Sequence, residues 1–234
     1  MIEVRGAAKR YGGVVALADC SMAIERPGIY GLIGPNGAGK TTLFDVITGA
    51  TLPDAGRVRI EGRDVTGIAP HRLAALGVAR SFQECRVFPQ FTCLENLGFS
   101  LQMHRVGKTL RREQALRMLR LVNLESYADE PAASLSFGQR RLLEIVGTFI
   151  VQPRFLLLDE PASGVNPMLL ETLTGFLRAM YQQRPGVFLI VEHNMQFIME
   201  LAEELIVMHQ GAVLDRGAPE AIQASPRVIE AYLG

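Results

Sequence analysis

The sequence predicts an α/β fold in which strands and helices alternate around a main sheet, with a smaller antiparallel sheet beside it and a separate helical region. Three observations support this prediction. A glycine-rich segment joins an apolar run to a helical pattern, a later apolar run ends in two acidic residues, and a stretch of helical periodicity lies between them. Because alternating strands and helices form parallel sheets, we expect both apolar runs to end at one ligand-binding edge.

The pattern changes twice along the chain. Before about residue 78, short apolar runs alternate with glycine turns, as in residues 57–62, which is typical of antiparallel strands. Leucines at helical spacing follow, and strands and helices alternate again from Phe155. We expect one domain over residues 1–234, with a core and antiparallel sheet at about 1–90 and 153–234 and a helical subdomain at about 91–152.

Four strands are predicted for the main sheet, each a short apolar run that ends near a glycine or an acidic residue. They cover residues 28–33, 155–159, 186–192 and 205–208. Helices are predicted over residues 43–47, after Pro167 and after Asn194. This order places each strand's carboxyl end before a helix or a loop, where ligand-binding residues collect.

Composition excludes several classes of protein. The chain has 234 residues, of which 48% are hydrophobic, but no apolar run is long enough to cross a membrane. Charged residues at positions 3, 5, 9 and 10 interrupt any secretory signal, so we expect a cytoplasmic protein. Lys and Arg (24) balance Asp and Glu (24), which gives no overall attraction to nucleic acid. Cys20, Cys85 and Cys93 lack metal-ligand spacing and are expected to be reduced thiols.

The glycine-rich segment fits the pattern of a phosphate-binding loop, G-x-x-x-x-G-K-[ST]. Glycines let backbone amides wrap around phosphates, Lys40 supplies a positive charge, and the hydroxyl of Thr41 suits Mg²⁺. The helix that follows adds the positive end of its dipole. We therefore expect the nucleotide-binding residues Gly34, Pro35, Asn36, Gly37, Ala38, Gly39, Lys40, Thr41 and Thr42.

The apolar run of residues 155–158 ends in Asp159 and Glu160. In enzymes with a phosphate loop, an acid at this place holds Mg²⁺, and a following acid can polarise the attacking water as a general base. A buried strand with a solvated acidic end would show the same pattern. The phosphate loop in the same chain favours the functional interpretation.

A third feature precedes an amphipathic helical pattern and consists of Leu135, Ser136, Phe137, Gly138 and Gln139. Ser136 can be a simple helix N-cap. A serine and a glycine at a helix start also form an anion site, and one nucleotide does not need two such sites from one chain. The segment is therefore expected to contact the nucleotide of a second copy in a head-to-tail dimer.

Together these features resemble the ATP-binding subunits of ABC transporters over almost the whole chain. The resemblance implies a P-loop ATPase of the ABC type, with ATP and Mg²⁺ as cofactors. It implies that residues 135–139 are the signature motif, acting in trans, although Phe137 stands where glycine is commonest. Residues 163–166 fall at the dimer-contact loop, with Asn166 in place of the usual aspartate.

The resemblance also assigns roles to single residues. Tyr11 is the aromatic residue that stacks on adenine, and Gln83 is the lid glutamine that contacts Mg²⁺ and water. His193 is the switch histidine at the terminal phosphate. The implied catalytic residues are Glu160, His193, Lys40 and Gln83, and the implied metal-binding residues are Thr41, Gln83 and Asp159.

Further segments resemble the ATPase subunit with a glutamine lid in importers of branched-chain amino acids. They cover residues 64–68, 76–83, 86–89, 94–96, 166–167 and 229–234. The stretch of residues 104–113 is shorter than the corresponding stretch usually is in that subunit. The resemblance implies partners: a homologous ATPase subunit, transmembrane permease subunits and, through them, a substrate-binding protein, with the chain on the inner face of the membrane.

Alternatives remain open at this point. The chain could energise another cargo, such as urea, an amide or a lipid, or act as a non-transport ABC scaffold. A translation or DNA-repair ATPase is disfavoured because the chain has neither a second such domain nor a long coiled coil. The arginine-rich stretch of residues 105–120 is interpreted as a solvated helix face near lipid headgroups rather than a nucleic-acid site. A permease groove is expected at Val87, Phe88, Phe91 and Leu94.

Overall fold

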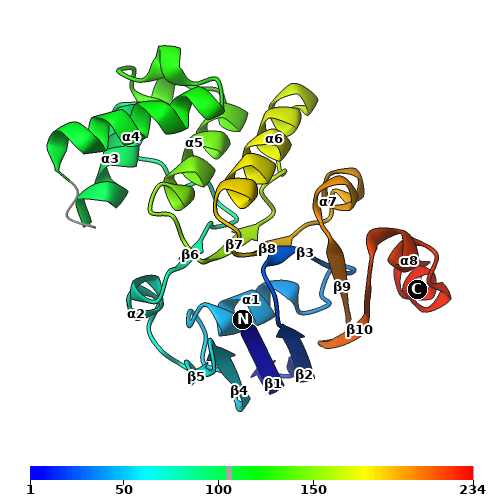
Figure 1. Ribbon diagram of the computed structural model, residues 1–234. Helices are drawn as coiled ribbons and strands as arrows, with labels where there is room; N and C mark the ends of the chain where they lie inside the picture. The colour runs from blue at the N-terminus through cyan, green and yellow to red at the C-terminus, as the bar shows by residue number, and fades with distance from the viewer. Residues whose placement is uncertain (104–106, 234) are drawn as a thin grey trace.

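Two β-sheets of different topology organise the computed structural model, which describes residues 1–103 and 107–233 (Figure 1). The main sheet has six strands in the order β10-β9-β3-β8-β7-β6, and only β10 runs antiparallel to its neighbour. Every residue of β3, β7 and β8 is buried, as expected for parallel strands covered on both faces. The strands are β3 (Gly28–Ile33), β6 (Val78–Arg80), β7 (Phe155–Asp159), β8 (Val187–Val191), β9 (Glu204–His209) and β10 (Ala212–Gly217).

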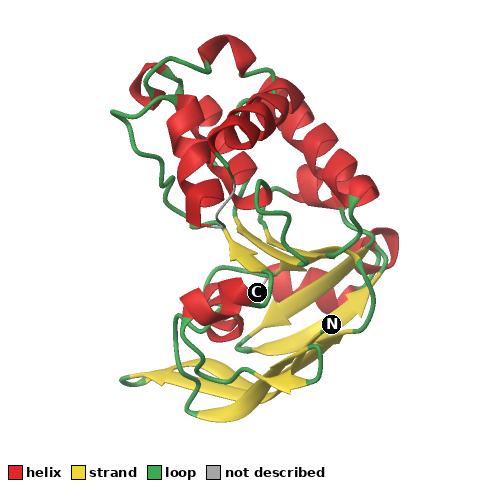
Figure 2. Ribbon diagram, turned by 60° about the vertical axis from the view of Figure 1, so that its left-hand side comes forward, coloured by secondary structure: helices red, strands yellow, loops and turns green. Residues whose placement is uncertain are grey.

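The second sheet is antiparallel, with the order β2-β1-β4-β5, and lies at the bottom of Figure 2. Its strands alternate between buried and exposed positions, because one face packs on the core and the other meets solvent. The strands are β1 (Ile2–Tyr11), β2 (Val14–Ile24), β4 (Ala55–Ile60) and β5 (Arg63–Asp64).

Helices occupy both sides of the main sheet. Helix α1 (Lys40–Ile47) lies between the two sheets, where Phe44 packs with residues of both. Helices α5 (Phe137–Phe149), α6 (Pro167–Gln183) and α7 (Met195–Leu201) cover the opposite face. Shorter helices lie at the edges: α2 (Pro70–Ala75), α8 (Pro219–Gln223) and α9 (Pro226–Leu233).

Helices α3 (Cys93–Met103) and α4 (Lys108–Leu121) pack with α5 into a helical layer at the top of both ribbon views. Two short 3-10 turns, Glu125–Tyr127 and Ala132–Ser134, connect α4 to α5. The layer begins at a reciprocal cap, in which Thr92 and Glu95 each accept a hydrogen bond from the other's backbone N–H.

The core divides at the main sheet because successive strand residues point to opposite faces. In β7, Leu156 and Leu158 join the cluster that includes α5, α6 and α7, whereas Phe155 and Leu157 join the cluster between the sheets. The strand is thus fixed from both sides up to its carboxyl end at Asp159, which positions the acidic pair.

The predicted fold class is confirmed: a main sheet with one antiparallel strand, a flanking antiparallel sheet and a helical region. Strands β3 and β7 have the predicted bounds, β8 is one residue shorter at each end, and β9 is one residue longer at each end. Helix α1 begins at Lys40, three residues before the predicted start, because the phosphate loop itself winds into the first turn. Strands β6 and β10 and helices α2, α8 and α9 were not predicted from the sequence.

The stretch of residues 104–113 falls partly outside the described residues, because 104–106, including Arg105, are not among them. Of the remainder, Gly107 is the N-cap of α4 and residues 108–113 belong to that helix. Over the described ranges, no helix is both long and apolar enough to span a bilayer.

Candidate functional site

The predicted phosphate loop forms a turn between β3 and α1 at the carboxyl edge of the main sheet. Its backbone is fixed by neighbours, since the Gly211 N–H donates to Ala38 O at 3.0 Å and the Leu43 N–H donates to Gly39 O at 2.9 Å. The side chain of Asn36 is exposed, and Ala38 is buried. The loop is therefore a fixed turn that opens into a helix N-terminus, the geometry of an anion site.

Two glycines of the loop are required by close backbone approach. A Cβ on Gly34 would come within 2.2 Å of Met208 O, and one on Gly39 would come within 2.3 Å of Ala16 O. Both residues also have positive φ angles, 148° and 96°, which side chains disfavour. These contacts lock the loop against β9 and β2.

Lys40 is the first residue of α1 and is only 8% exposed. Its ammonium group donates to Gly34 O at 2.7 Å and to Pro35 O at 2.9 Å, so the charge lies inside its own loop. Burial lowers the pKa of Lys40, and the charges of Glu160 and Asp159 oppose that shift. The lysine is thus electrostatically coupled to both acids at the end of β7.

Asp159 ends β7 and is 2% exposed. One of its carboxylate oxygens lies 3.4 Å from a terminal guanidinium nitrogen of Arg80. The other terminal nitrogen of Arg80 donates to Asp45 Oδ1 at 2.6 Å and to Thr48 Oγ1 at 2.8 Å. Burial raises the pKa of Asp159, and the positive charge of Arg80 opposes this effect. Arg80 therefore orients the carboxylate toward the edge where α1 begins.

Glu160 occupies a left-handed turn with φ 47°, an unusual conformation for a residue with a side chain. Its N–H donates to Val191 O at 2.9 Å, and its Oε1 lies 3.3 Å from Nδ1 of His193. The His193 side chain is 59% exposed and that of Glu160 is 19% exposed. The structure thus brings together a carboxylate and an imidazole at the mouth of the site.

A buried carboxylate lies behind this pair. Glu192 is 1% exposed and accepts backbone hydrogen bonds from Ala162 at 2.7 Å and from His193 and Asn194 at 3.0 Å. Burial raises the pKa of Glu192, and the backbone donors oppose the shift. Glu192 therefore ties the turn after Glu160 to the turn that carries His193.

The signature-like segment forms the N-terminus of α5. Ser136 caps the helix by accepting from the Gln139 N–H at 3.3 Å, and Gln139 Oε1 accepts from the Ser136 N–H at 2.9 Å. Phe137 is 49% exposed, and a Cβ on Gly164 would come within 2.5 Å of its ring. The motif therefore packs on its own chain's loop after β7, through an aromatic ring and a glycine.

The lid segment, residues 81–91, leads from β6 to the helical layer. The Ser81 hydroxyl accepts from the Asp159 N–H at 3.0 Å, whereas Gln83 is exposed and, in the described part of the chain, makes no hydrogen bond to a predicted site residue. Tyr11 is 49% exposed at the end of β1, in the hairpin whose second strand approaches the phosphate loop at Ala16.

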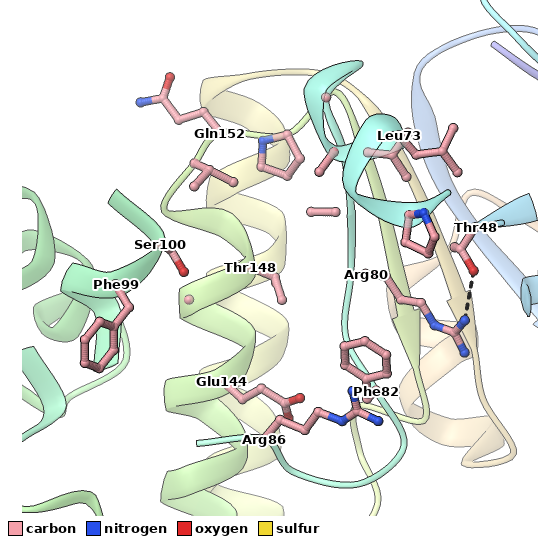
Figure 3. Close-up of a pocket in the computed structure, with 18 of the residues that line it drawn as sticks. Thr48, Leu73, Arg80, Phe82, Arg86, Phe99, Ser100, Glu144, Thr148 and Gln152 are labelled. Atoms are coloured by element: carbon pink, nitrogen blue, oxygen red, sulfur yellow. Dashed lines mark hydrogen bonds between the residues drawn. The ribbon is translucent and has the colours of Figure 1, made fainter. Parts of the chain in front are cut away.

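A cavity of about 930 Å³ opens between the lid segment, α2, α3 and α5 (Figure 3). Of the residues predicted for a permease groove, Val87 and Phe88 line this cavity and Phe91 does not. Phe88, Phe91 and Phe99 form an exposed edge-to-face cluster with ring centroids 5.1–5.9 Å apart. The prediction for Leu94 is wrong: it is 8% exposed and packs in the core, because it lies on the buried side of α3.

The side chains near the phosphate loop offer oxygen donors of several kinds. Over residues 1–103 and 107–233, no three His, Cys, Asp or Glu side chains gather as a metal site would require. The predicted metal-binding residues offer a hydroxyl on Thr41 and a carboxylate on Asp159 at the edge of the sheet, and an amide on Gln83 in the lid segment. Such a sparse, hard-oxygen set fits Mg²⁺, which keeps waters and takes phosphate ligands.

Three charged residues of this region were not predicted from the sequence: Arg80, Arg141 and Glu192. A signal was present for Arg141, because it lies four residues before Ile145 and thus on the apolar face of α5. For Arg80 and Glu192 the strand pattern gives little warning, since each stands at the carboxyl end of a buried run.

The comparisons with known proteins establish the family. The model described as "ABC transporter" matches residues 17–163, more than half of the chain. The chain belongs to this family and is an ATP-binding ATPase of the ABC type. A second model, described as "Branched-chain amino acid ATP-binding cassette transporter", matches residues 216–234.

Curated relatives match over the full length. The chain is 36% identical to the high-affinity branched-chain amino acid transport ATP-binding protein BraF of Pseudomonas aeruginosa, covering 100% of this chain and 98% of the relative. It is 34% identical to LivG of Escherichia coli, which carries the same description, with the same coverage. A probable LivG of Archaeoglobus fulgidus is 34% identical, with 100% and 95% covered.

Solved structures share the fold. A nucleotide-free ATP-binding cassette from an ABC transporter superposes with a TM-score of 0.88 at 28% identity, covering 100% of this chain and 99% of that one. An ABC transporter cassette in its ADP conformation gives 0.87 at 29% identity, covering 100% and 98%. The predicted family and fold are therefore confirmed.

Proposed function

We propose that this chain is the ATP-hydrolysing subunit of an importer for branched-chain amino acids. The observation that carries the proposal is full-length similarity to ATP-binding proteins described as branched-chain amino acid transport components, together with the matched C-terminal segment, residues 216–234. No observation favours another cargo or a scaffold role. The cargo itself would be recognised by partner subunits, which this ATPase energises.

The nucleotide binds, in this proposal, over the phosphate loop. Backbone amides of residues 34–39 and the N-terminus of α1 receive the phosphates, and Tyr11 stacks on the base. Lys40 leaves its carbonyl partners for phosphate oxygens, which offer its buried ammonium a full negative charge. Because the loop is held by β2 and β9, it is already ordered in the absence of nucleotide, and binding costs less conformational entropy.

Hydrolysis then depends on the acids at the end of β7. Glu160 accepts a proton from the attacking water, as a general base, and its turn is fixed on both sides of the residue. His193, beside Glu160, donates toward the terminal phosphate. Since phosphoryl transfer needs little covalent chemistry from the protein, positioning and charge account for most of the catalysis.

Mg²⁺ accompanies the nucleotide and neutralises charge on its phosphates. Thr41, Asp159 and Gln83 are the residues proposed to hold it. Arg80 keeps the Asp159 carboxylate in place through their ion pair. Gln83 is exposed and must approach from the lid segment, so closure of the lid completes the set.

A second copy, or a homologous subunit, completes the site. The signature turn packs beside the loop after β7, and the cap bonds of α5 join Ser136 to Gln139 rather than to the phosphate loop. We propose a head-to-tail dimer in which residues 135–139 contact the nucleotide held by the partner's phosphate loop. Two nucleotides would then be enclosed between two chains.

The cavity at the lid segment is the proposed seat of a permease helix. Exposed aromatic rings rarely gather on a surface without a partner, and here two of the three, Phe88 and Phe99, line a cavity between two parts of the fold. Asn96 holds the aromatic loop by bonding backbone atoms of Phe88, Phe91 and Thr92. A helix-in-groove contact at this place would put the chain on the inner face of the membrane.

The test is reconstitution with its permease subunits and substrate-binding protein in lipid vesicles. We expect ATP hydrolysis to rise when the binding protein carries leucine, isoleucine or valine, and not when urea is supplied. Stimulation by urea alone would overturn the cargo assignment. Absence of any complex with a permease would overturn the transport role.

A further inference from the structure

Arg141, on the second turn of α5, is a deeply buried charged side chain near the site, at 1% exposure. One terminal nitrogen donates to Phe82 O at 2.6 Å and to Glu144 Oε2 at 2.7 Å. The other donates to Asp159 O at 2.6 Å and to Glu160 O at 3.0 Å. One guanidinium therefore holds the lid segment, the end of β7 and the turn of the proposed base.

These contacts bear on the orientation of Glu160. The residue lies in the left-handed region, where a side chain disfavours the backbone, so neighbouring contacts must maintain it. On its amino side the N–H donates to Val191 O, and on its carboxyl side the carbonyl accepts from Arg141 at 3.0 Å and from the Ser163 N–H at 3.1 Å. A shift of Arg141 would rotate this turn and move the carboxylate.

The charge partner of Arg141 connects the same group to the cavity. Glu144 lies one turn further along α5 and lines the cavity, as do Phe82 and Arg86 of the lid segment. Figure 3 shows the Glu144, Phe82 and Arg86 side chains at the same end of it. An occupant of the cavity would thus contact two of the groups that Arg141 binds.

The arrangement is not explained by stability alone. The Nε of Arg141 has no hydrogen-bond partner within the described residues, so a buried polar atom is left unsatisfied. Replacement of a buried ion pair by apolar residues of similar volume is often neutral or stabilising. An apolar pair could not bind the carbonyl group of Phe82 in the lid segment and those of Asp159 and Glu160 after β7.

We propose that Arg141 is a positioning residue that relays occupancy of the cavity to the catalytic turn. The inference rests on the proposed function of Glu160 and of the cavity. When a permease helix presses on the lid segment and Glu144, Arg141 shifts the carbonyl groups of Asp159 and Glu160, which sets the base. Helix α5, which carries Arg141, has Ser136 as its N-cap, so contact of Ser136 with a partner's nucleotide acts on Arg141 as well.

The test compares four chains, each reconstituted with the permease and also measured alone: wild type, Arg141→Lys, the double variant Arg141→Met/Glu144→Met, and Arg178→Met. Arg178, a more exposed arginine on α6, is the control, because it also donates to a backbone carbonyl and pairs with a glutamate, both of Glu200. ATP affinity, kcat with and without permease, and thermal unfolding are measured for each.

We expect both Arg141 variants to bind ATP within about threefold of wild type, while kcat falls by about 10²-fold, because the base is displaced rather than removed. The ratio of kcat with permease to kcat alone should fall to about one, and Arg178→Met should behave as wild type. The double variant should remain folded, since no buried charge loses its partner.

The inference is overturned if the folded double variant keeps wild-type kcat and stimulation, or if it fails to fold, which would mean that the role is structural. The kcat of the wild-type chain with and without permease separates a failure of the proposed function from a failure of the relay through Arg141. If the wild-type chain is not stimulated by the permease, the proposed function fails; if it is stimulated and the variants are too, only the relay fails.

Discussion

The phosphate loop and the signature turn are both helix N-termini, yet the molecule treats them differently. The loop joins β3 to α1 and packs against β9 and β2, and its lysine is 8% exposed and bonded within its own turn. The signature turn caps α5 with two polar side chains and exposes Ser136 and Phe137. The phosphate loop is thus part of the sheet edge, whereas the signature turn belongs to the helical layer.

This difference indicates where each part finds its ligand. Residues on the sheet edge, from Lys40 to Glu160 and His193, are coupled to one another by charge or contact within one chain. The helical layer reaches this edge through Arg141, which donates to the carbonyl groups of Asp159 and Glu160, and through Phe137, which packs on Gly164 in the loop after β7. We therefore expect changes at the sheet edge to act within the chain and changes on the helical layer to act through partners.

Lys40→Ala tests the sheet edge with the largest expected effect. Loss of the ammonium removes a charge both for bound nucleotide and for the transition state, so kcat/KM for ATP should fall by about 10⁴-fold or more. Fluorescent ATP analogue binding and phosphate release measure the two parts. Hydrolysis at the wild-type rate would refute the assignment of this loop.

Glu160→Gln should separate binding from chemistry at the same edge. The amide keeps the shape but cannot accept the proton of water, so kcat should fall by about 10²–10⁴-fold while ATP still binds. The variant should accumulate as an ATP-bound dimer, measured by size-exclusion chromatography. If it hydrolyses ATP normally, another group is the base.

Ser136→Arg tests the helical layer. The added bulk and charge should block the nucleotide of the partner and lower kcat by about 10²–10³-fold, with ATP binding to the variant's own loop retained. Mixed with Lys40→Ala chains, it should form dimers with one intact composite site and recover part of the turnover. Normal hydrolysis by Ser136→Arg alone would contradict the role in trans.

Phe88→Asp should have the smallest effect on the lone chain. Phe88 is 55% exposed, so the variant should fold and bind ATP within about twofold of wild type. Its affinity for the permease should fall by at least about 30-fold, because the aromatic ring that the permease would bury is lost. Leu52→Asp, at another exposed apolar position, is the control. Unfolding of Phe88→Asp would place the ring in the core, and full assembly would place the docking surface elsewhere.

The same comparison explains what could be predicted from the sequence. The strands before the phosphate loop and the acid pair are continuous apolar runs with unambiguous ends, so β3 and β7 were predicted with their observed bounds. The roles of the site residues stay predictions, because they concern a nucleotide and partner chains. Leu94 was misjudged because an apolar residue near an aromatic cluster has no local sign of which side of α3 it occupies.

The groups that hold the site were harder to predict. Arg80, Arg141 and Glu192 act on backbone atoms or carboxylates up to 79 residues away in the sequence, through contacts that exist only once the sheets and helices pack. A charged residue on a buried face can be recognised as unusual. Its partners cannot be named without the fold.

The most direct test of the two-region account is a cross-link between chains. Cysteines are placed at Asn36, in the phosphate loop, and at Ser136. The chain also carries Glu160→Gln, to retain ATP, and Cys85→Ser, to remove the one native thiol that is not buried. A short thiol-specific linker should join Asn36→Cys of one chain to Ser136→Cys of the other only when ATP is present. Cross-links that form within a single chain, or equally without ATP, would contradict the head-to-tail site.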